Sequence, residues 1–89
     1  MKEVRYSTKA RKDLKRYRHD IAKMKELFYV LHVLASGEQL DKRYHPHMLS
    51  GNYNDCMECH VGSDFLLIWI DKEAIYVERV GSHAELFGK

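Results

Sequence analysis

The chain has 89 residues, 45% of them hydrophobic and 11% aromatic, enough for one small domain whose core needs no disulfide or metal. No segment comes near the roughly 18 consecutive apolar residues of a membrane span, and the charged N-terminus lacks the apolar stretch of a signal peptide. These features argue against a membrane protein. They predict one globular domain, residues 1–89, soluble in the cytoplasm.

Charge is distributed unevenly along the chain, although the net charge is only +2. Residues 1–30 contain ten Lys and Arg against four Asp and Glu, whereas residues 31–89 contain five against nine. A cationic segment of this kind suits contact with phosphates or with an acidic protein partner. A solvated helix surface without any ligand is an equally good interpretation.

A strand and a first helix are predicted at the N-terminus. Val4 and Tyr6 alternate with charged residues, as in a half-buried strand. Ser7 or Thr8 can then cap a helix by accepting a hydrogen bond from a free N–H group of its first turn. Three apolar residues share one face of this helix: Ala10, Leu14 and Tyr17. Basic residues occupy its other faces: Lys9, Arg11, Lys12, Lys15, Arg16 and Arg18.

A second helix is predicted from a cap at Asp20 to a stop at Gly37. Apolar residues recur along it at steps of three and four: Ile21, Met24, Leu27, Phe28, Leu31, Leu34 and Ala35. Because neither Gly nor Pro separates the two helical segments, one bent helix is the alternative. A long loop, residues 37–54, follows, and loops of this length in compact domains are often functional.

Three strands are predicted in the second half, at residues 53–61, 65–70 and 74–80, with turns at GSD and DKE. The middle segment, FLLIWI, is apolar on both faces, as expected of a central buried strand. The last eight residues, SHAELFGK, are expected to form a short turn or helix that closes the sheet. The sequence therefore predicts an α+β fold in which a small, mostly antiparallel sheet is packed by an N-terminal pair of helices.

The segment CMECH, residues 56–60, has the C-x-x-C-H spacing of a haem attachment site and half the cysteines of a zinc site. On a strand, however, Cys56 and Cys59 point to opposite faces, so they cannot bind one metal or one haem. No second C-x-x-C or H-x-x-x-H follows to complete a zinc site. We expect no haem and no zinc, and two reduced thiols packed as small core residues.

Histidines form the most informative set, since the chain contains six. Four of them lie at the edges of predicted elements: His45, His47, His60 and His83. Asp64 and Arg79 lie near neighbouring strand ends. Such a cluster supplies what metal-free RNA cleavage requires, namely a base for the 2′-hydroxyl, a cation for the phosphate and an acid for the leaving 5′-oxygen. Any single histidine here is more commonly a surface or capping residue.

The segment YHPHMLSGNYNDCMECHVGSDFLLIWI, followed by ERVGSHAELFG, resembles the YafQ-like branch of the RelE/ParE superfamily, bacterial toxins of type II toxin–antitoxin pairs. The family pattern runs H-x-L-x-G, then R-[DE]-x-H-[IV]-x-x-D, then R-x-G-[ST]-H-x-x-L-F. The chain matches it at these positions: His47, Leu49, Gly51, Glu58, His60, Val61, Asp64, Arg79, Gly81, Ser82, His83, Leu86 and Phe87. The resemblance extends over the whole chain.

The resemblance implies a metal-independent endoribonuclease of the bacterial cytoplasm that cleaves mRNA, typically in the ribosomal A site, and is inhibited by a cognate antitoxin. It implies no cofactor and no membrane partner. Four residues fall on catalytic positions: His47, His60, Asp64 and His83. His83 is expected to be the general acid and His47 or His60 the general base, with Asp64 orienting an imidazole. Six residues are expected to contact substrate: Arg79 at the phosphate, Phe87 at a base, and the basic Lys9, Arg11, Lys12 and Arg16.

Two departures from the family pattern keep an alternative open. Met57 stands where the pattern often has Arg, and the preceding loop lacks the Trp and Lys common there. Two cations near the scissile phosphate would then be missing. The alternative is a RelE/ParE-superfamily protein that binds RNA or an antitoxin without cleaving RNA. His45 lies outside the pattern and is expected to be structural or exposed.

Overall fold

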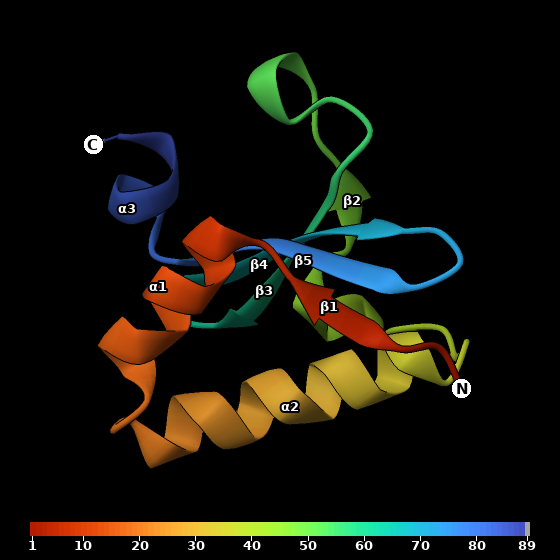
Figure 1. Cartoon of the computed structure of the whole chain (residues 1–89), viewed down its shortest axis with the longest axis horizontal. Coiled ribbons are helices and arrows are strands. Elements are labelled where there is room, and N and C mark those ends of the chain that lie inside the picture. The colour runs from red at the N-terminus through yellow and green to blue at the C-terminus, as the bar shows by residue number, and fades with distance from the viewer. Residues whose placement is uncertain (89) are drawn as a thin grey trace.

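A central β-sheet organises the computed structural model, which describes residues 1–88 (Figure 1). Within these residues the sheet has five strands in the order β1-β5-β4-β3-β2. Their bounds are β1 Val4–Tyr6, β2 His47–Met48, β3 Met57–Gly62, β4 Phe65–Asp71 and β5 Ile75–Gly81. Strand β1 pairs with β5 in parallel and the other pairs are antiparallel. The predicted α+β fold with a mostly antiparallel sheet is confirmed.

The N-terminal helices are two separate elements rather than one bent helix, α1 (Thr8–Tyr17) and α2 (Ile21–Ala35). The Ser7 hydroxyl accepts a hydrogen bond from the Ala10 N–H at 3.0 Å, and Asp20 accepts one from the Lys23 N–H at 3.2 Å. Because each helix carries its own cap, the chain turns between them without Gly or Pro. No helix within residues 1–88 has the length and apolar character needed to cross a bilayer.

The loop between α2 and β3 contains more structure than the sequence indicates. It forms two short 3₁₀ helices, η1 (Lys42–Tyr44) and η2 (Gly51–Tyr53), and the two-residue strand β2. The predicted strand 53–61 is therefore displaced and starts only at Met57, because residues 51–53 form η2. The C-terminal segment forms helix α3 (His83–Phe87), and Lys89 lies outside the described residues.

The sheet separates two hydrophobic clusters. Helix α2 runs along one face, and α3 lies on the other side of the sheet (Figure 1). Alternate residues of β4 enter the two clusters, Leu67 and Trp69 on the side of α2, Leu66 and Ile68 on the side of α3. Cys59 belongs to the first cluster and Cys56 to the second, which confirms that the two thiols lie on opposite faces.

Candidate functional site

Strand register brings the predicted catalytic residues to one end of the sheet. His60 on β3 pairs with Leu66 on β4, and Leu66 pairs with Gly81 on β5, so His60 and the start of α3 lie on one line across the sheet. The two-residue turn between β3 and β4 places Asp64 at the same end. Its φ of 48° is left-handed, a conformation that Asp tolerates better than most residues.

Three imidazole rings lie around that of His60. Its ring centroid lies 5.5 Å from that of His45, 6.4 Å from that of His47 and 6.0 Å from that of His83. We call these four residues the histidine cluster. His45, which falls outside the family pattern and was expected to be structural or exposed, is exposed, and its ring is the nearest of the three to His60. The signal that could have found it is its position two residues before His47.

Asp64 holds His83 by two contacts. Its Oδ1 atom accepts hydrogen bonds from the backbone N–H of His83 at 2.9 Å and lies 2.8 Å from the ring Nδ1. These hydrogen bonds, first the backbone one, lower the pKa of Asp64 below its usual value. Because Nδ1 faces the carboxylate, Nε2 is the ring nitrogen of His83 left to exchange a proton with a substrate.

His47 is held on both sides. Its Nε2 lies 3.0 Å from Oε1 of Glu58, the residue opposite it on β3, and its Nδ1 lies 2.7 Å from the carbonyl oxygen of His45. Glu58 is only 4% exposed, and its other oxygen, Oε2, has no hydrogen-bond partner within residues 1–88. Glu58 matches the family pattern, but no catalytic or binding role was predicted for it.

Helix α3 is fixed firmly at its N-terminus, where His83 is the first helical residue. Ser82 and Glu85 form a capping box, each side chain accepting a hydrogen bond from the other residue's backbone N–H. The Tyr17 hydroxyl of α1 also donates to Glu85. Burial and the neighbouring Glu85 raise the pKa of Tyr17 to about 12. The position of His83 therefore depends on both α1 and the capping box.

Phe87, expected to contact a base, extends the site away from His60. Its ring lies 6.2 Å from His83 and 5.8 Å from Tyr53, in an edge-to-face arrangement with the latter. Phe87 is 46% exposed and, together with Tyr53, lines a cavity of about 450 Å³ that also includes Lys9. The structure thus brings Lys9 and Phe87, two of the predicted substrate contacts, together next to the cluster.

The remaining predicted substrate contacts are placed differently. Arg16 lies 3.4 Å from Glu85 and 3.7 Å from Asp13, whereas Lys12 is exposed on α1. Arg11 lines a separate hollow beside β1, which also includes Glu3 and Tyr76. Basic residues of α1 therefore face more than one part of the surface.

Arg79 is engaged by a buried carboxylate that sequence analysis did not single out. Asp13, which is 2% exposed, accepts hydrogen bonds from Arg79 Nε at 2.8 Å, from its terminal nitrogen at 3.1 Å and from the Val80 N–H at 3.0 Å. Hydrogen bonding to Asp13 raises the pKa of Arg79 further. The proposed contact of Arg79 with phosphate therefore has to coexist with this ion pair.

Met57, the main departure from the family pattern, packs against the hydrophobic cluster on the α2 side of the sheet. Glu58 and His60 follow Met57 by one and three residues, so their side chains lie on the opposite face of β3, the face of the histidine cluster. A longer basic side chain at position 57 would start from the face opposite the histidine cluster.

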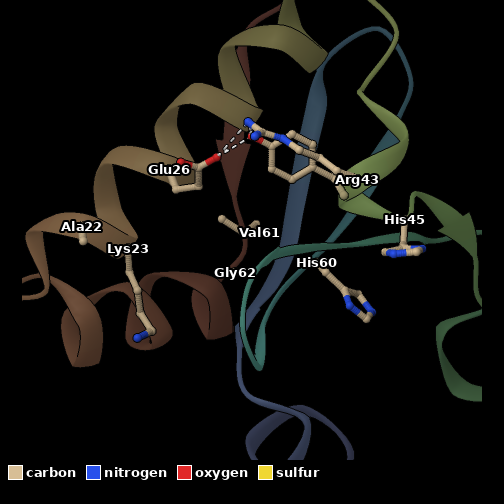
Figure 2. A pocket seen from close by; sticks show the side chains of 9 residues that line it. Ala22, Lys23, Glu26, Arg43, His45, His60, Val61 and Gly62 are labelled. Atoms are coloured by element: carbon tan, nitrogen blue, oxygen red, sulfur yellow. Dashed lines mark hydrogen bonds and ion pairs between the residues drawn. The ribbon is translucent and has the colours of Figure 1, made fainter.

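A cavity of about 550 Å³ adjoins the histidine cluster between α2, η1 and the end of β3 (Figure 2). His45 and His60 line one side of it, and the contacting pair Glu26 and Arg43 lines another. Within residues 1–88, no group of three or more His, Cys, Asp or Glu side chains is arranged to hold a metal ion.

Comparison with known proteins places this site in a family. Residues 2–88 match the family described as "Bacterial toxin of type II toxin-antitoxin system, YafQ". The mRNA interferase toxin YafQ of Escherichia coli (strain K12) is 30% identical over 89 residues, covering 98% of this chain and 97% of that protein. Its name agrees with the predicted class of enzyme.

Solved structures agree in fold as well as in sequence. The crystal structure of the E. coli DinJ-YafQ toxin–antitoxin complex contains a chain with a TM-score of 0.85 and 30% identity, with 98% of each chain covered. A metal-bound toxin from Helicobacter pylori has a TM-score of 0.88 and 36% identity, covering 98% of this chain and all of the other. The predicted family is thus confirmed: the chain belongs to the YafQ family of bacterial toxins of type II toxin–antitoxin systems.

Proposed function

We propose that this toxin is an mRNA interferase that cleaves mRNA on the ribosome, without a metal, through the histidine cluster and Asp64. The observation that carries the proposal is the pairing of two imidazoles in different environments. The ring of His60 lies 6.0 Å from that of His83, and Asp64 engages only His83. Two imidazoles at this separation can serve one phosphodiester, one as base and the other as acid.

His60 is better arranged than His47 to be the general base. Both ring nitrogens of His47 already face acceptors, the Glu58 carboxylate and the His45 carbonyl oxygen. A base needs one free nitrogen lone pair, and the half-buried ring of His60 makes no hydrogen bond within residues 1–88. His47 then acts as a fixed neighbour of His60, because Glu58 and the His45 carbonyl oxygen hold both of its ring nitrogens.

The reaction balances with these two residues alone. His60 takes the proton of the 2′-hydroxyl, and the 2′-oxygen attacks the adjacent phosphorus. The bond between phosphorus and the 5′-oxygen breaks, and His83 Nε2 donates a proton to that leaving oxygen. The products are a 2′,3′-cyclic phosphate and a 5′-hydroxyl, and Asp64 keeps the His83 ring in position throughout.

The same proposal includes two macromolecular partners. The basic residues of α1, Lys9, Lys12 and Arg16, recur at steps of three and four, so they lie on one exposed side that leads towards Phe87. Such a surface supports contact with the phosphates of ribosomal RNA or mRNA. A cognate antitoxin is proposed as the protein partner by analogy with the DinJ-YafQ complex of the E. coli relative.

The test is to map mRNA ends by primer extension in a translating extract. We expect wild-type protein to produce breaks, and His60→Ala or His83→Ala to reduce the cleavage rate by about 10²- to 10⁴-fold, the usual contribution of a general acid or base. His32→Ala, an exposed histidine of α2 outside the cluster, is the matched control and should cleave normally.

Absence of breaks with wild-type protein in an active extract would contradict the proposal and favour an RNA-binding or antitoxin-binding protein that does not cleave. Equal loss of activity in His32→Ala would show that the histidine substitutions act through folding. Cleavage of free RNA that disappears on adding EDTA would refute the metal-independent mechanism.

A further inference from the structure

The cavity in Figure 2 shares two side chains with the histidine cluster but lies beyond it. His45 and His60 line it, and its other walls come from α2, η1 and the β3–β4 hairpin. Its volume of about 550 Å³ falls within the range of roughly 300–1,000 Å³ typical of small-molecule pockets. Part of a substrate bound at His60 could therefore extend into this cavity.

Arg43 is the cation in this cavity best placed for an anionic ligand. Its guanidinium carbon lies 4.7 Å from the centroid of the Tyr44 ring, and its terminal nitrogen donates a hydrogen bond to the Tyr44 hydroxyl at 2.7 Å. The Tyr44 hydroxyl in turn donates to Glu26, whose carboxylate stays 3.8 Å from Arg43. Tyr44 is buried, so its hydroxyl offers the guanidinium a hydrogen-bond partner in a fixed position.

Arg43 nevertheless remains accessible, since its side chain is 67% exposed. The other cation of the cavity, Lys23, is paired with Asp20 at 3.2 Å. A planar guanidinium whose one carboxylate partner within residues 1–88, Glu26, lies as far as 3.8 Å away suits recognition of a phosphate group. The neighbouring imidazoles of His45 and His60 offer flat ring surfaces for a base or ribose.

We propose that this cavity binds the nucleotide on the 5′ side of the scissile phosphate, with Arg43 contacting that nucleotide's own 5′-phosphate. The inference rests on the proposed function, because it takes its direction from the acid and base assignment. The attacking 2′-hydroxyl belongs to the 5′ nucleotide, and the leaving 5′-oxygen belongs to the 3′ nucleotide.

The positions of the base and the acid therefore fix the polarity of the RNA. His60, the base, lines the Arg43 cavity, whereas His83, the acid, lies next to Phe87. The RNA then runs 5′ to 3′ from the Arg43 cavity, across the cluster, towards Phe87 and the second cavity that contains Lys9. The two cavities receive nucleotides on opposite sides of one phosphate.

Two nucleotide probes separate the two sides in an NMR titration of the full chain. A nucleoside 3′-monophosphate with its phosphate at the cluster directs its base and ribose to the 5′ side, and a nucleoside 5′-monophosphate directs them to the 3′ side. We expect the 3′-monophosphate to shift the amide signals of Arg43 and Gly62, and the 5′-monophosphate to shift those of Tyr53 and Phe87. Both should shift His60 and His83.

Variants test the role of Arg43 with a nucleoside 3′,5′-bisphosphate, whose second phosphate occupies the position assigned to the 5′-phosphate. Arg43→Ala should weaken its binding by about two- to fivefold, the range for an exposed ion pair, while Arg43→Lys retains part of the affinity. The matched control is Lys25→Ala, an exposed cation of α2 outside the cavity, which should bind as wild type does.

Each outcome decides a separate point. Shifts at His60 and His83 without any at Arg43 or Gly62 would overturn the 5′ subsite and leave the proposed function intact. Reversed responses to the two monophosphates would overturn the polarity. An unchanged bisphosphate affinity in Arg43→Ala would remove Arg43 from the subsite. If neither monophosphate shifts His60 or His83, the proposed function itself fails and the subsite fails with it.

Discussion

Replacement of Asp13 by alanine is expected to be the most destabilising single change at the site. Asp13 accepts two hydrogen bonds from Arg79 and one from the Val80 N–H, and its side chain is 3% exposed against 16% for Arg79. Asp13→Ala therefore leaves a largely buried guanidinium and a buried N–H group without their acceptor. Removing one partner of a buried ion pair costs about 3–5 kcal/mol.

That loss is large for this chain. A domain of this length has a free energy of unfolding of about 4–13 kcal/mol, from roughly 0.05–0.15 kcal/mol per residue, so the variant should lose at least about a quarter of its stability. The control is Asp71→Ala, which removes the exposed pair with Lys2, where the side chains are 48% and 37% exposed. An exposed pair is worth at most about 1 kcal/mol.

Urea unfolding followed by circular dichroism measures both variants, and a double-mutant cycle with Arg79→Ala isolates the pair. We expect the double variant to be less destabilised than the sum of the single ones, because removing both partners leaves no uncompensated charge. If Asp13→Ala lowers the free energy of unfolding by no more than Asp71→Ala does, the ion pair of Asp13 with Arg79 does not stabilise the fold as argued from its burial. If the cleavage rate of Arg79→Ala falls by a larger factor than its folded fraction does, the result would support the predicted contact of Arg79 with phosphate.

Three further outcomes follow from the geometry of the site. Gly81→Ala should lower the free energy of unfolding, measured by urea titration, by about 1–3 kcal/mol and should slow cleavage. The reason is that φ of Gly81 is 157° and that a Cβ there would lie 2.7 Å from Oε1 of Glu85, a member of the capping box. Hydrogen bonds with His83 lower the pKa of Asp64 in the folded protein. The stability that this carboxylate adds is therefore fully present above its unfolded pKa of about 3.9 and is lost as the pH falls through the lowered value. The free energies of unfolding of wild type and Asp64→Asn should accordingly converge only in acid. Burial raises the pKa of Cys59 to about 12, so iodoacetamide at pH 8 should modify it only after unfolding in urea, and rapid modification of native protein would contradict its placement in the core.

Local signals in the sequence were sufficient for most of the fold. Ser7 and Asp20 cap the two helices because capping depends only on residues within one turn. The two faces of a strand follow from residue parity, so the separation of Cys56 from Cys59 was predictable even though Cys56 itself precedes β3. The apolar segment FLLIWI gave the central strand β4 almost to its last residue.

Features that depend on distant partners could not be predicted in this way. Strand β2 has two residues and exists because His47 and Met48 pair with β3, so no alternating pattern marks it. Asp13 looks like one more charged residue of a basic helix, and its burial results from Arg79, 66 residues later. His45 joins the cluster through a left-handed backbone with φ of 50°, which no local pattern of the sequence specifies.

The family resemblance supplied the candidate catalytic set, and the structure brings its four members together around His60. It also adds a distinction that motifs cannot make. His47 and His60 match the pattern equally well, but only His47 has both ring nitrogens facing acceptors. The assignment of His60 as base therefore depends on hydrogen bonds, and it stays a prediction until the variants are compared.

The parallel pairing of β1 with β5 has a consequence for the time at which the toxin becomes active. The first strand of the chain is completed by the last one, and Ser7 donates a hydrogen bond to the Glu78 carbonyl oxygen 71 residues later. Contacts so distant in sequence slow folding, because the chain between them has to close into a loop before they can form. A chain that ends before β5 has neither a partner for β1 nor His83, so it cannot assemble the cluster. The active site can therefore form only after β5 and His83 have been synthesised.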